Sequence, residues 1–147
     1  MTGKPPDPLF GRIALIGIGL IGSSLARVIR RDGLARHIAV AARTQGTLDK
    51  AVELGLADSV TLDARDAARD ADAILTMLMR PEIIRDVLYG EQGVVHGAKP
   101  GAVVVDMSTM SPAFQRERFA EVTDASFVEA APLAILVITI VGIGVYP

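Results

Sequence analysis

Residues 12–30 read RIALIGIGLIGSSLARVIR, and this stretch decides the fold. Its glycines, Gly17, Gly19 and Gly22, follow the spacing G-x-G-x-x-G. The residues just before them, 13–16, form a short apolar run that is typical of a β-strand, and the apolar residues after them recur at helical spacing. A strand, a glycine turn and a helix in this order predict the first unit of a dinucleotide-binding domain.

Each glycine of the turn has its own physical role. Gly17 allows the tight turn, Gly19 lets the backbone approach a pyrophosphate, and Gly22 lets the helix pack closely on the strand. The free N–H groups at the start of the helix face the phosphates, and the helix dipole adds a positive partial charge there. We therefore expect the whole turn to contact the cofactor, through Gly17, Ile18, Gly19, Leu20, Ile21 and Gly22.

The composition narrows the classes of function. A chain of 147 residues, of which 50% are hydrophobic, suits one domain with a real core. The net charge of −2 gives no support for nucleic-acid binding. The sequence has no cysteine, which excludes a disulfide framework, a thiolate metal site and a cysteine nucleophile. Because it has only two histidines, His37 and His96, we expect no metal site either.

Strand and helix patterns alternate along the chain, which predicts an α/β fold. We expect a single domain with a doubly wound, Rossmann-type and mainly parallel sheet. The expected strands are residues 12–16, 37–42, 73–78, 102–105 and 126–128. The expected helices are residues 20–31, 47–54 with Thr47 as its N-cap, 63–69, one that begins at Pro81, and 111–122.

The two ends of the chain differ in composition from the part between them. Residues 1–11 are proline-rich and are expected to be a flexible leader rather than a secretory signal, and residues 12–134 form the NAD(P)-binding domain. Residues 130–147 carry no charge, but this stretch is slightly short for a membrane-spanning helix, which needs about 20 apolar residues. We expect residues 135–147 to form a strand, with membrane association and an aggregation-prone tail as alternatives. The protein is expected to be cytoplasmic.

The first part of the chain resembles one family of dehydrogenases. Residues 10–73 are similar to the nucleotide-binding domain of prephenate and arogenate dehydrogenases. The similarity is carried by GIGLIGSSLA at residues 17–26, VAART at 40–44 and AVELGLAD at 51–58.

The following part resembles a second family with the same fold. Residues 72–112 are similar to β-hydroxyacid dehydrogenases of the 3-hydroxyisobutyrate type, above all through PGAVVVDMST at residues 100–109. The two resemblances meet near residues 71–74. A hybrid chain and a truncated chain are both open interpretations.

The end of the second strand selects the cofactor. An Asp or Glu there would bind the ribose 2′-hydroxyl of NAD. This sequence has Arg43 and Thr44 instead, and a guanidinium beside a hydroxyl suits a 2′-phosphate. We expect NADP as the cofactor, with NAD or dual use left open and a merely solvated Arg43 as the alternative.

Further contacts are implied by the resemblance. It places Leu78 and Met79 beside the cofactor and brings Ser108 or Thr109 to the nicotinamide. These residues follow predicted strands, and ligands of open α/β sheets bind at the carboxyl ends of strands. Plain packing of Leu78 and Met79, and turn formation by the serine-rich segment, are the alternatives. Asp106 is a candidate buried carboxylate without an assigned role.

No catalytic residue can be assigned. The prephenate dehydrogenase resemblance implies a histidine where this chain has Ala131, and the hydroxyacid resemblance implies a Ser-Gly-Gly where it has Leu133 and Ala134. Both histidines are expected at the surface or in capping roles, with His96 in a loop.

The sequence predicts the NAD(P)-binding domain of an oxidoreductase of these families, without its substrate domain. The alternatives are a small NADP-dependent dehydrogenase or reductase that acts as a dimer and a non-catalytic dinucleotide-binding module. The expected partners are the dinucleotide, a small hydroxyacid substrate and a second copy of the chain.

Overall fold

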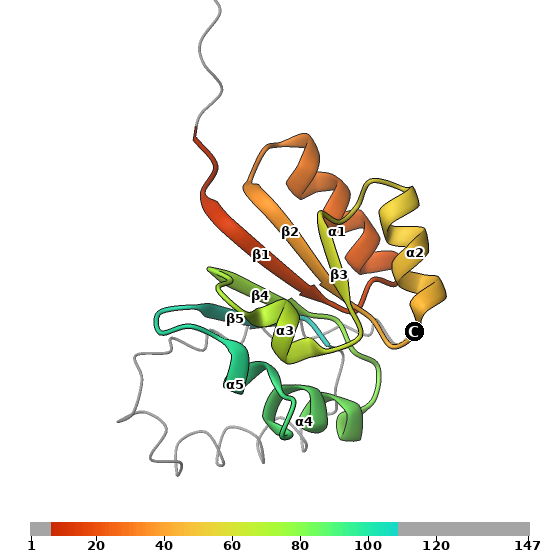
Figure 1. The fold of residues 1–147 in the computed structure, drawn as a ribbon, viewed down its shortest axis with the longest axis vertical. Helices are drawn as coiled ribbons and strands as arrows, with labels where there is room; N and C mark the ends of the chain where they lie inside the picture. Colours follow the sequence, from red (N-terminus) through yellow and green to blue (C-terminus); the bar gives the residue numbers. More distant parts are fainter. Residues whose placement is uncertain (1–6, 109–147) are drawn as a thin grey trace, which may run out of the picture.

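The computed structural model describes residues 7–108, which form a five-stranded sheet with helices on both faces (Figure 1). The strands are β1 (Phe10–Ile16), β2 (Ala35–Ala41), β3 (Ser59–Thr61), β4 (Ala73–Thr76) and β5 (Val103–Asp106). The helices are α1 (Leu20–Arg31), α2 (Gln45–Glu53), α3 (Ala64–Ala68), α4 (Pro81–Tyr89) and α5 (Val94–Gly97).

Neighbouring strands are parallel, and their order in the sheet is β3-β2-β1-β4-β5. The chain begins at the centre with β1, adds β2 and β3 on one side, and then crosses back to add β4 and β5 on the other. The order therefore reverses between β1 and β4. The predicted α/β, doubly wound, Rossmann-type fold is confirmed.

The central strand β1 is buried on both faces of the sheet. Ile13 and Leu15 pack in one apolar cluster with residues of α1 and α2. Ala14 and Ile16 pack in a second cluster with residues of α3, α4 and α5. Because successive side chains of a strand point to opposite faces, a strand that is covered on both sides must be apolar throughout. All four side chains are at most 3% exposed.

The bounds of several elements differ from those predicted. Helix α1 matches its prediction, whereas α2 begins at Gln45 and not at residue 47. Thr44 is the N-cap of α2, and its hydroxyl oxygen accepts the backbone N–H of Thr47 at 3.4 Å, so the assignment of the cap to Thr47 was wrong. Strand β2 begins at Ala35, and β4 ends at Thr76 rather than at residue 78.

Two short elements were not predicted. Strand β3 has three residues, which pair with β2 from Ala39↔Ser59 to Ala41↔Thr61. Helix α5 is a single turn that contains His96, which was expected in a loop. This turn lies against α3 so closely that a Cβ on Gly97 would be 2.1 Å from the carbonyl oxygen of Arg65. Both elements depend on contacts with distant segments, which local sequence patterns do not encode.

Asp72 joins the amino ends of β1 and β4, at the edge opposite to the glycine turn. Its Oδ2 accepts the backbone N–H groups of Gly11 at 2.6 Å and Arg12 at 3.0 Å, and its Oδ1 pairs with the ammonium group of Lys99. The hydrogen bond from Lys99, followed by that from Arg12, lowers the pKa of Asp72 below its ordinary value.

Several predictions lie outside residues 7–108: the elements at 111–122 and 126–128, the tail at 135–147, Thr109 and Ala131. At the other end, β1 begins at Phe10, inside the segment expected to be a leader. Among the described residues, no helix is long and apolar enough to cross a membrane.

Candidate cofactor-binding site

The carboxyl ends of β1, β2, β4 and β5 meet at one edge of the sheet (Figure 1). The turn from Gly17 to Gly19 leaves β1 at this edge and leads directly into α1. The strand order reverses beside this turn, between β1 and β4. In open α/β sheets, ligands bind in the crevice at such a point.

Two of the three glycines are required by the protein itself. Gly17 has φ +97°, and a Cβ there would lie 2.6 Å from the carbonyl oxygen of Met77. A Cβ on Gly22 would lie 2.4 Å from the carbonyl oxygen of Gly17. A side chain at either position would therefore collide with backbone atoms. The roles predicted for these two glycines, a tight turn and close helix packing, agree with this geometry.

Gly19 differs from its two neighbours. A Cβ on Gly19 would have no atom within 4 Å, and its φ of −71° is accessible to any residue. No described part of the protein explains why this position is a glycine. Open space above the turn is what a pyrophosphate that approaches the backbone requires, so the turn fits the cofactor predicted for it.

Within residues 7–108, the start of α1 offers backbone donors without a partner. Gly19 is the N-cap, no side chain caps the helix, and the first turn contains no acidic residue. The first intrahelical bond is donated by Ser23 N–H to the carbonyl oxygen of Gly19 at 2.9 Å. The preceding N–H groups, including those of Leu20 and Ile21, are thus available to an anion.

The end of β2 carries the two residues predicted to select the cofactor. Arg43 is exposed, and within residues 7–108 it forms no ion pair. The hydroxyl of Thr44 is engaged, because it accepts the N–H of Thr47 and shares a hydrogen bond of 2.8 Å with the Thr47 hydroxyl. Arg43 is therefore the better candidate for a contact with the ribose.

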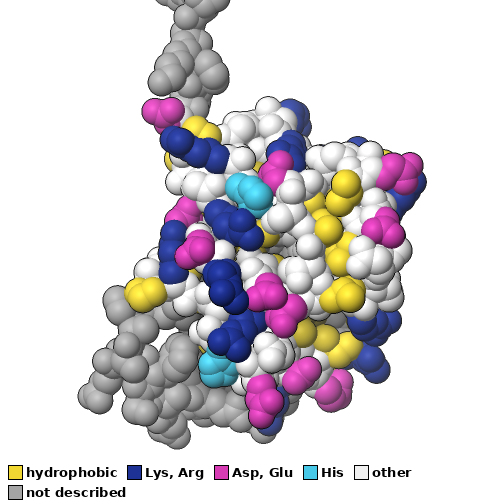
Figure 2. Space-filling model, viewed as in Figure 1, with side chains coloured by type: hydrophobic (Ala, Val, Ile, Leu, Met, Phe, Trp, Pro, Cys, Tyr) yellow, Lys and Arg dark blue, Asp and Glu magenta, His cyan; other side chains and the backbone are white. Residues whose placement is uncertain are grey.

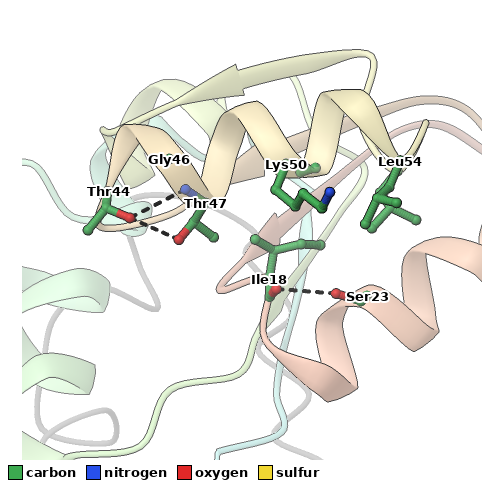
Figure 3. Close-up of a pocket in the computed structure, with 9 residues that line it drawn as sticks. Ile18, Ser23, Thr44, Gly46, Thr47, Lys50 and Leu54 are labelled. Atoms are coloured by element: carbon green, nitrogen blue, oxygen red, sulfur yellow. Dashed lines mark hydrogen bonds between the residues drawn. The ribbon is translucent and has the colours of Figure 1, made fainter.

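An open pocket of about 420 Å³ extends from this edge between α1 and α2. Figure 3 shows Thr44, Lys50 and Leu54 of the α2 segment on one side and Ile18 and Ser23 on the other. The Ser23 hydroxyl donates to the carbonyl oxygen of Ile18 at 3.2 Å. The remaining lining residues are Gly46, Thr47, Ala51 and Leu56.

Several large apolar side chains of the described residues are exposed. Figure 2 shows them gathered over β3 and α2, where Val52 and Leu62 are 52% and 59% exposed. At the cofactor edge, Leu20 and Met79 are each 91% exposed. The position of Leu20 and Met79 leaves both side chains accessible to a ligand at this edge.

The ends of β4 and β5 are joined by buried polar side chains. Asp106 is 2% exposed, and its Oδ1 accepts the Thr76 hydroxyl at 2.8 Å and the Ser108 N–H at 3.0 Å. The Ser108 hydroxyl oxygen in turn accepts the backbone N–H of Leu78 at 2.9 Å. Asp106 is thus a buried carboxylate, as the sequence suggested. Thr76 was missed because a single threonine at the end of an apolar strand carries no local signal.

The structure brings most of the predicted site residues to this one edge. The Leu78 side chain lies 3.7 Å from the Cβ position of Gly17, so the β4 loop and the glycine turn are in contact. The histidines lie elsewhere: His37 shares a hydrogen bond of 2.8 Å with the Ser59 hydroxyl, and His96 belongs to α5. Across the described residues, no cluster of three or more metal-binding side chains occurs.

Fold and site together define a Rossmann-type dinucleotide-binding domain. The chain belongs to the family described as the NAD binding domain of 6-phosphogluconate dehydrogenase, whose model matches residues 12–131. This single match spans residues 71–74, where the two sequence resemblances meet. The cofactor of the domain is a nicotinamide dinucleotide.

Relatives come from both families that the sequence resembled. The chain is 35% identical over 100 residues to 3-sulfolactaldehyde reductase of Escherichia coli, covering 68% of this chain and 32% of the relative. It is 34% identical over 98 residues to cyclohexadienyl dehydrogenase of Zymomonas mobilis, covering 59% of this chain and 33% of the relative. The predicted class, the NAD(P)-binding domain of an oxidoreductase of these families, is confirmed.

A solved structure is similar to this chain in both sequence and fold. The 3-hydroxyisobutyrate dehydrogenase of Salmonella typhimurium superposes with a TM-score of 0.66 at 29% identity, covering 83% of this chain and 39% of that one. The chain therefore spans 32–39% of the length of these three proteins.

Proposed function

We propose that the chain binds NADP in preference to NAD and that Arg43 makes the selection. The observation that carries this proposal is an exposed guanidinium at the end of β2, with Ala41 and Ala42 before it and no carboxylate beside it in the sequence. An acidic residue at this point would favour the ribose 2′-hydroxyl of NAD, whereas a guanidinium binds phosphate oxygens.

The remaining contacts of the proposed site follow from the same edge. The backbone from Gly17 to Gly22 binds the pyrophosphate, while Leu78, Met79 and Ser108 line the other half of the site. Thr109, outside the described residues, belongs to the proposal by its resemblance to the hydroxyacid family. Thr44 contributes chiefly by fixing the start of α2 beside Arg43.

A titration with NADPH and NADH, followed by fluorescence, tests the proposal. We expect saturable binding of both and tighter binding of NADPH. Tighter binding of NADH would overturn the preference but not the site, and binding of neither would overturn the site itself.

For the whole protein we propose an NADP-dependent dehydrogenase that acts on a small hydroxyacid. The bound cofactor would supply the hydride acceptor or donor, and this chain binds and orients it. The support for this substrate class is the likeness to 3-hydroxyisobutyrate dehydrogenase of Salmonella typhimurium, whose name specifies a hydroxyacid and of which this chain covers 39%. Turnover assays with hydroxyacids on the complete protein test this part.

We further propose a cytoplasmic homodimer. The support for the dimer is the segment at residues 135–147, which carries no charge, is rich in β-branched residues and is suited to burial against a second copy. Size-exclusion chromatography of the chain with and without this segment tests the dimer, and an unchanged size would contradict it.

A further inference from the structure

Buried polar side chains form hydrogen bonds between β4 and β5 in addition to the backbone hydrogen bonds of the sheet. The backbones of the two strands are already paired from Ala73↔Val103 to Thr76↔Asp106. The ladder is extended by the Met107 N–H, which donates to the carbonyl oxygen of Thr76 at 2.8 Å. The strands are thus held together without any help from polar side chains.

The position of Asp106 nevertheless demands hydrogen bonds. A carboxylate that is 2% exposed is costly to bury unless donors surround it. Two of its donors are the Thr76 hydroxyl and the Ser108 N–H, which both approach Oδ1. Thr76 is itself fully buried, so its hydroxyl serves the interior of the protein and not solvent.

The network reaches past the strand ends to the ligand edge. Ser108 accepts the N–H of Leu78 through its hydroxyl oxygen, and the hydroxyl keeps a proton that it can donate. Met77, the residue before Leu78, packs against the glycine turn, because its carbonyl oxygen lies 2.6 Å from where a Cβ on Gly17 would be. Asp106 therefore fixes, through Ser108, the relative position of the two loops that follow β4 and β5.

These two loops belong to one half of the cofactor site. A dinucleotide lies across the point where strand order reverses, and the residue after β2 faces the adenosine ribose. The adenosine half then lies on the side of β2, and the nicotinamide half lies on the side of β4 and β5.

We propose that Thr76 and Asp106 are positioning residues for the nicotinamide half of the cofactor. They hold Ser108 and the Leu78 backbone in place at that half and leave the adenosine half untouched. The inference rests on the proposed cofactor site and adds to it two residues that do not touch the ligand.

The experiment separates the two halves of the cofactor. Binding is measured for NADPH and for 2′-phospho-ADP-ribose, which lacks only the nicotinamide ring; NADH and ADP-ribose replace them if the parent chain prefers NAD. The dissociation constant of the ring-free ligand, divided by that of NADPH, reports the contribution of the nicotinamide contact alone. In Thr76→Val we expect this ratio to shrink about fivefold, the size of one typical hydrogen bond, with binding of the ring-free ligand unchanged.

Two further variants serve as controls. Thr76→Ser keeps the hydroxyl and should retain the parent ratio. Asp72→Asn removes a carboxylate that joins β1 and β4 at the opposite edge, so it should lower the melting temperature without changing the ratio. All titrations are run well below the melting temperature of each variant, so that the folded fraction does not enter the comparison.

Each outcome bears on the proposal. A ratio lowered in Thr76→Val and kept in both controls supports it. An unchanged ratio in Thr76→Val, or equal weakening of both ligands, makes Thr76 and Asp106 structural only and overturns it. A parent chain that binds the ring-free ligand as tightly as NADPH has no nicotinamide contact to position, which also overturns it. Failure of the proposed function is distinct, because the parent would then bind neither ligand.

Discussion

Gly17, Gly19 and Gly22 share one motif but are constrained by different surroundings. A side chain at Gly17 or Gly22 would meet backbone oxygen atoms at 2.6 and 2.4 Å, whereas one at Gly19 would meet no atom of the described residues within 4 Å. Two glycines therefore serve the fold, and the third is open to a ligand. This difference allows binding and folding to be tested separately.

Gly19→Val should abolish tight cofactor binding and leave the fold intact. The branched side chain would occupy the space of the pyrophosphate, and overpacking of about 1–3 kcal/mol corresponds to roughly a five- to 150-fold loss of affinity. Fluorescence titration gives the affinity, and thermal denaturation gives the stability. Gly22→Val is the matched variant. It should have a clearly lower melting temperature than Gly19→Val, because its side chain would collide with the backbone. Parent-like affinity in Gly19→Val would show that the pyrophosphate lies elsewhere.

Arg43→Ala should weaken NADPH and spare NADH. A charge-assisted hydrogen bond contributes about 1.5–3 kcal/mol, so NADPH should bind roughly ten- to a hundredfold more weakly. Arg36→Ala is the control, because Arg36 is an exposed arginine near the opposite end of the same strand. An equal loss for both cofactors would remove the role of Arg43 at the 2′-phosphate.

At the scale of elements, polar contacts fix where helices and strands begin. Thr44 sets the start of α2 beside Arg43, and Asp72 ties β4 to β1 at the edge away from the site. Neither contact involves the hydrophobic core. Each can be removed by a substitution that leaves the apolar clusters unchanged.

Thr44→Ala should lower stability more than Thr47→Ala does. Loss of an N-cap costs about 1 kcal/mol, and only Thr44 accepts the N–H of another residue in the first turn of α2. Thr44→Ser should restore the stability. Chemical denaturation measures the three values. A larger loss in Thr47→Ala would return the cap to the position that the sequence suggested.

Asp72 should make stability depend on acid. Its pKa is lowered in the folded state, so its contribution is fully present above the unfolded value of about 3.8 and is lost as the pH falls through the folded value. We expect Asp72→Asn to be less stable than the parent by about 1 kcal/mol at neutral pH, since the site is partly exposed. The difference should shrink as the pH falls below about 3.8, because the carboxylate becomes protonated in the folded protein as well. Melting curves recorded from neutral to acidic pH test this prediction. A stability difference between Asp72→Asn and the parent that grew in acid would contradict it.

For the whole molecule, the nucleotide-binding edge is in place but a catalytic group is not identified. The edge supplies backbone donors, an exposed cation and a buried hydroxyl network. The two histidines of the sequence lie away from it. The resemblance to prephenate dehydrogenases would put a histidine where the sequence has Ala131.

We predict no steady-state oxidation of prephenate or 3-hydroxyisobutyrate by this 147-residue chain, although it binds the cofactor. Absorbance of the reduced cofactor measures the rate, and fluorescence on the same sample confirms that the cofactor is bound. Robust turnover of either substrate would mean that the chain carries its own acid–base group.

The sequence by itself determined the features that depend on neighbouring residues. The glycine spacing, the bounds of α1 and the alternation of strands and helices follow from local sterics and periodicity, and they were sufficient for the fold and the cofactor class. Only the tertiary structure decided what depends on distant pairing. Strand β3 forms by pairing with β2, and Thr76 meets Asp106 across 30 positions of the chain. The carbonyl oxygen of Met77 closes the space beside Gly17, which no local pattern links to it. Such contacts form when segments far apart in the chain pack together, so no local sequence pattern could predict them.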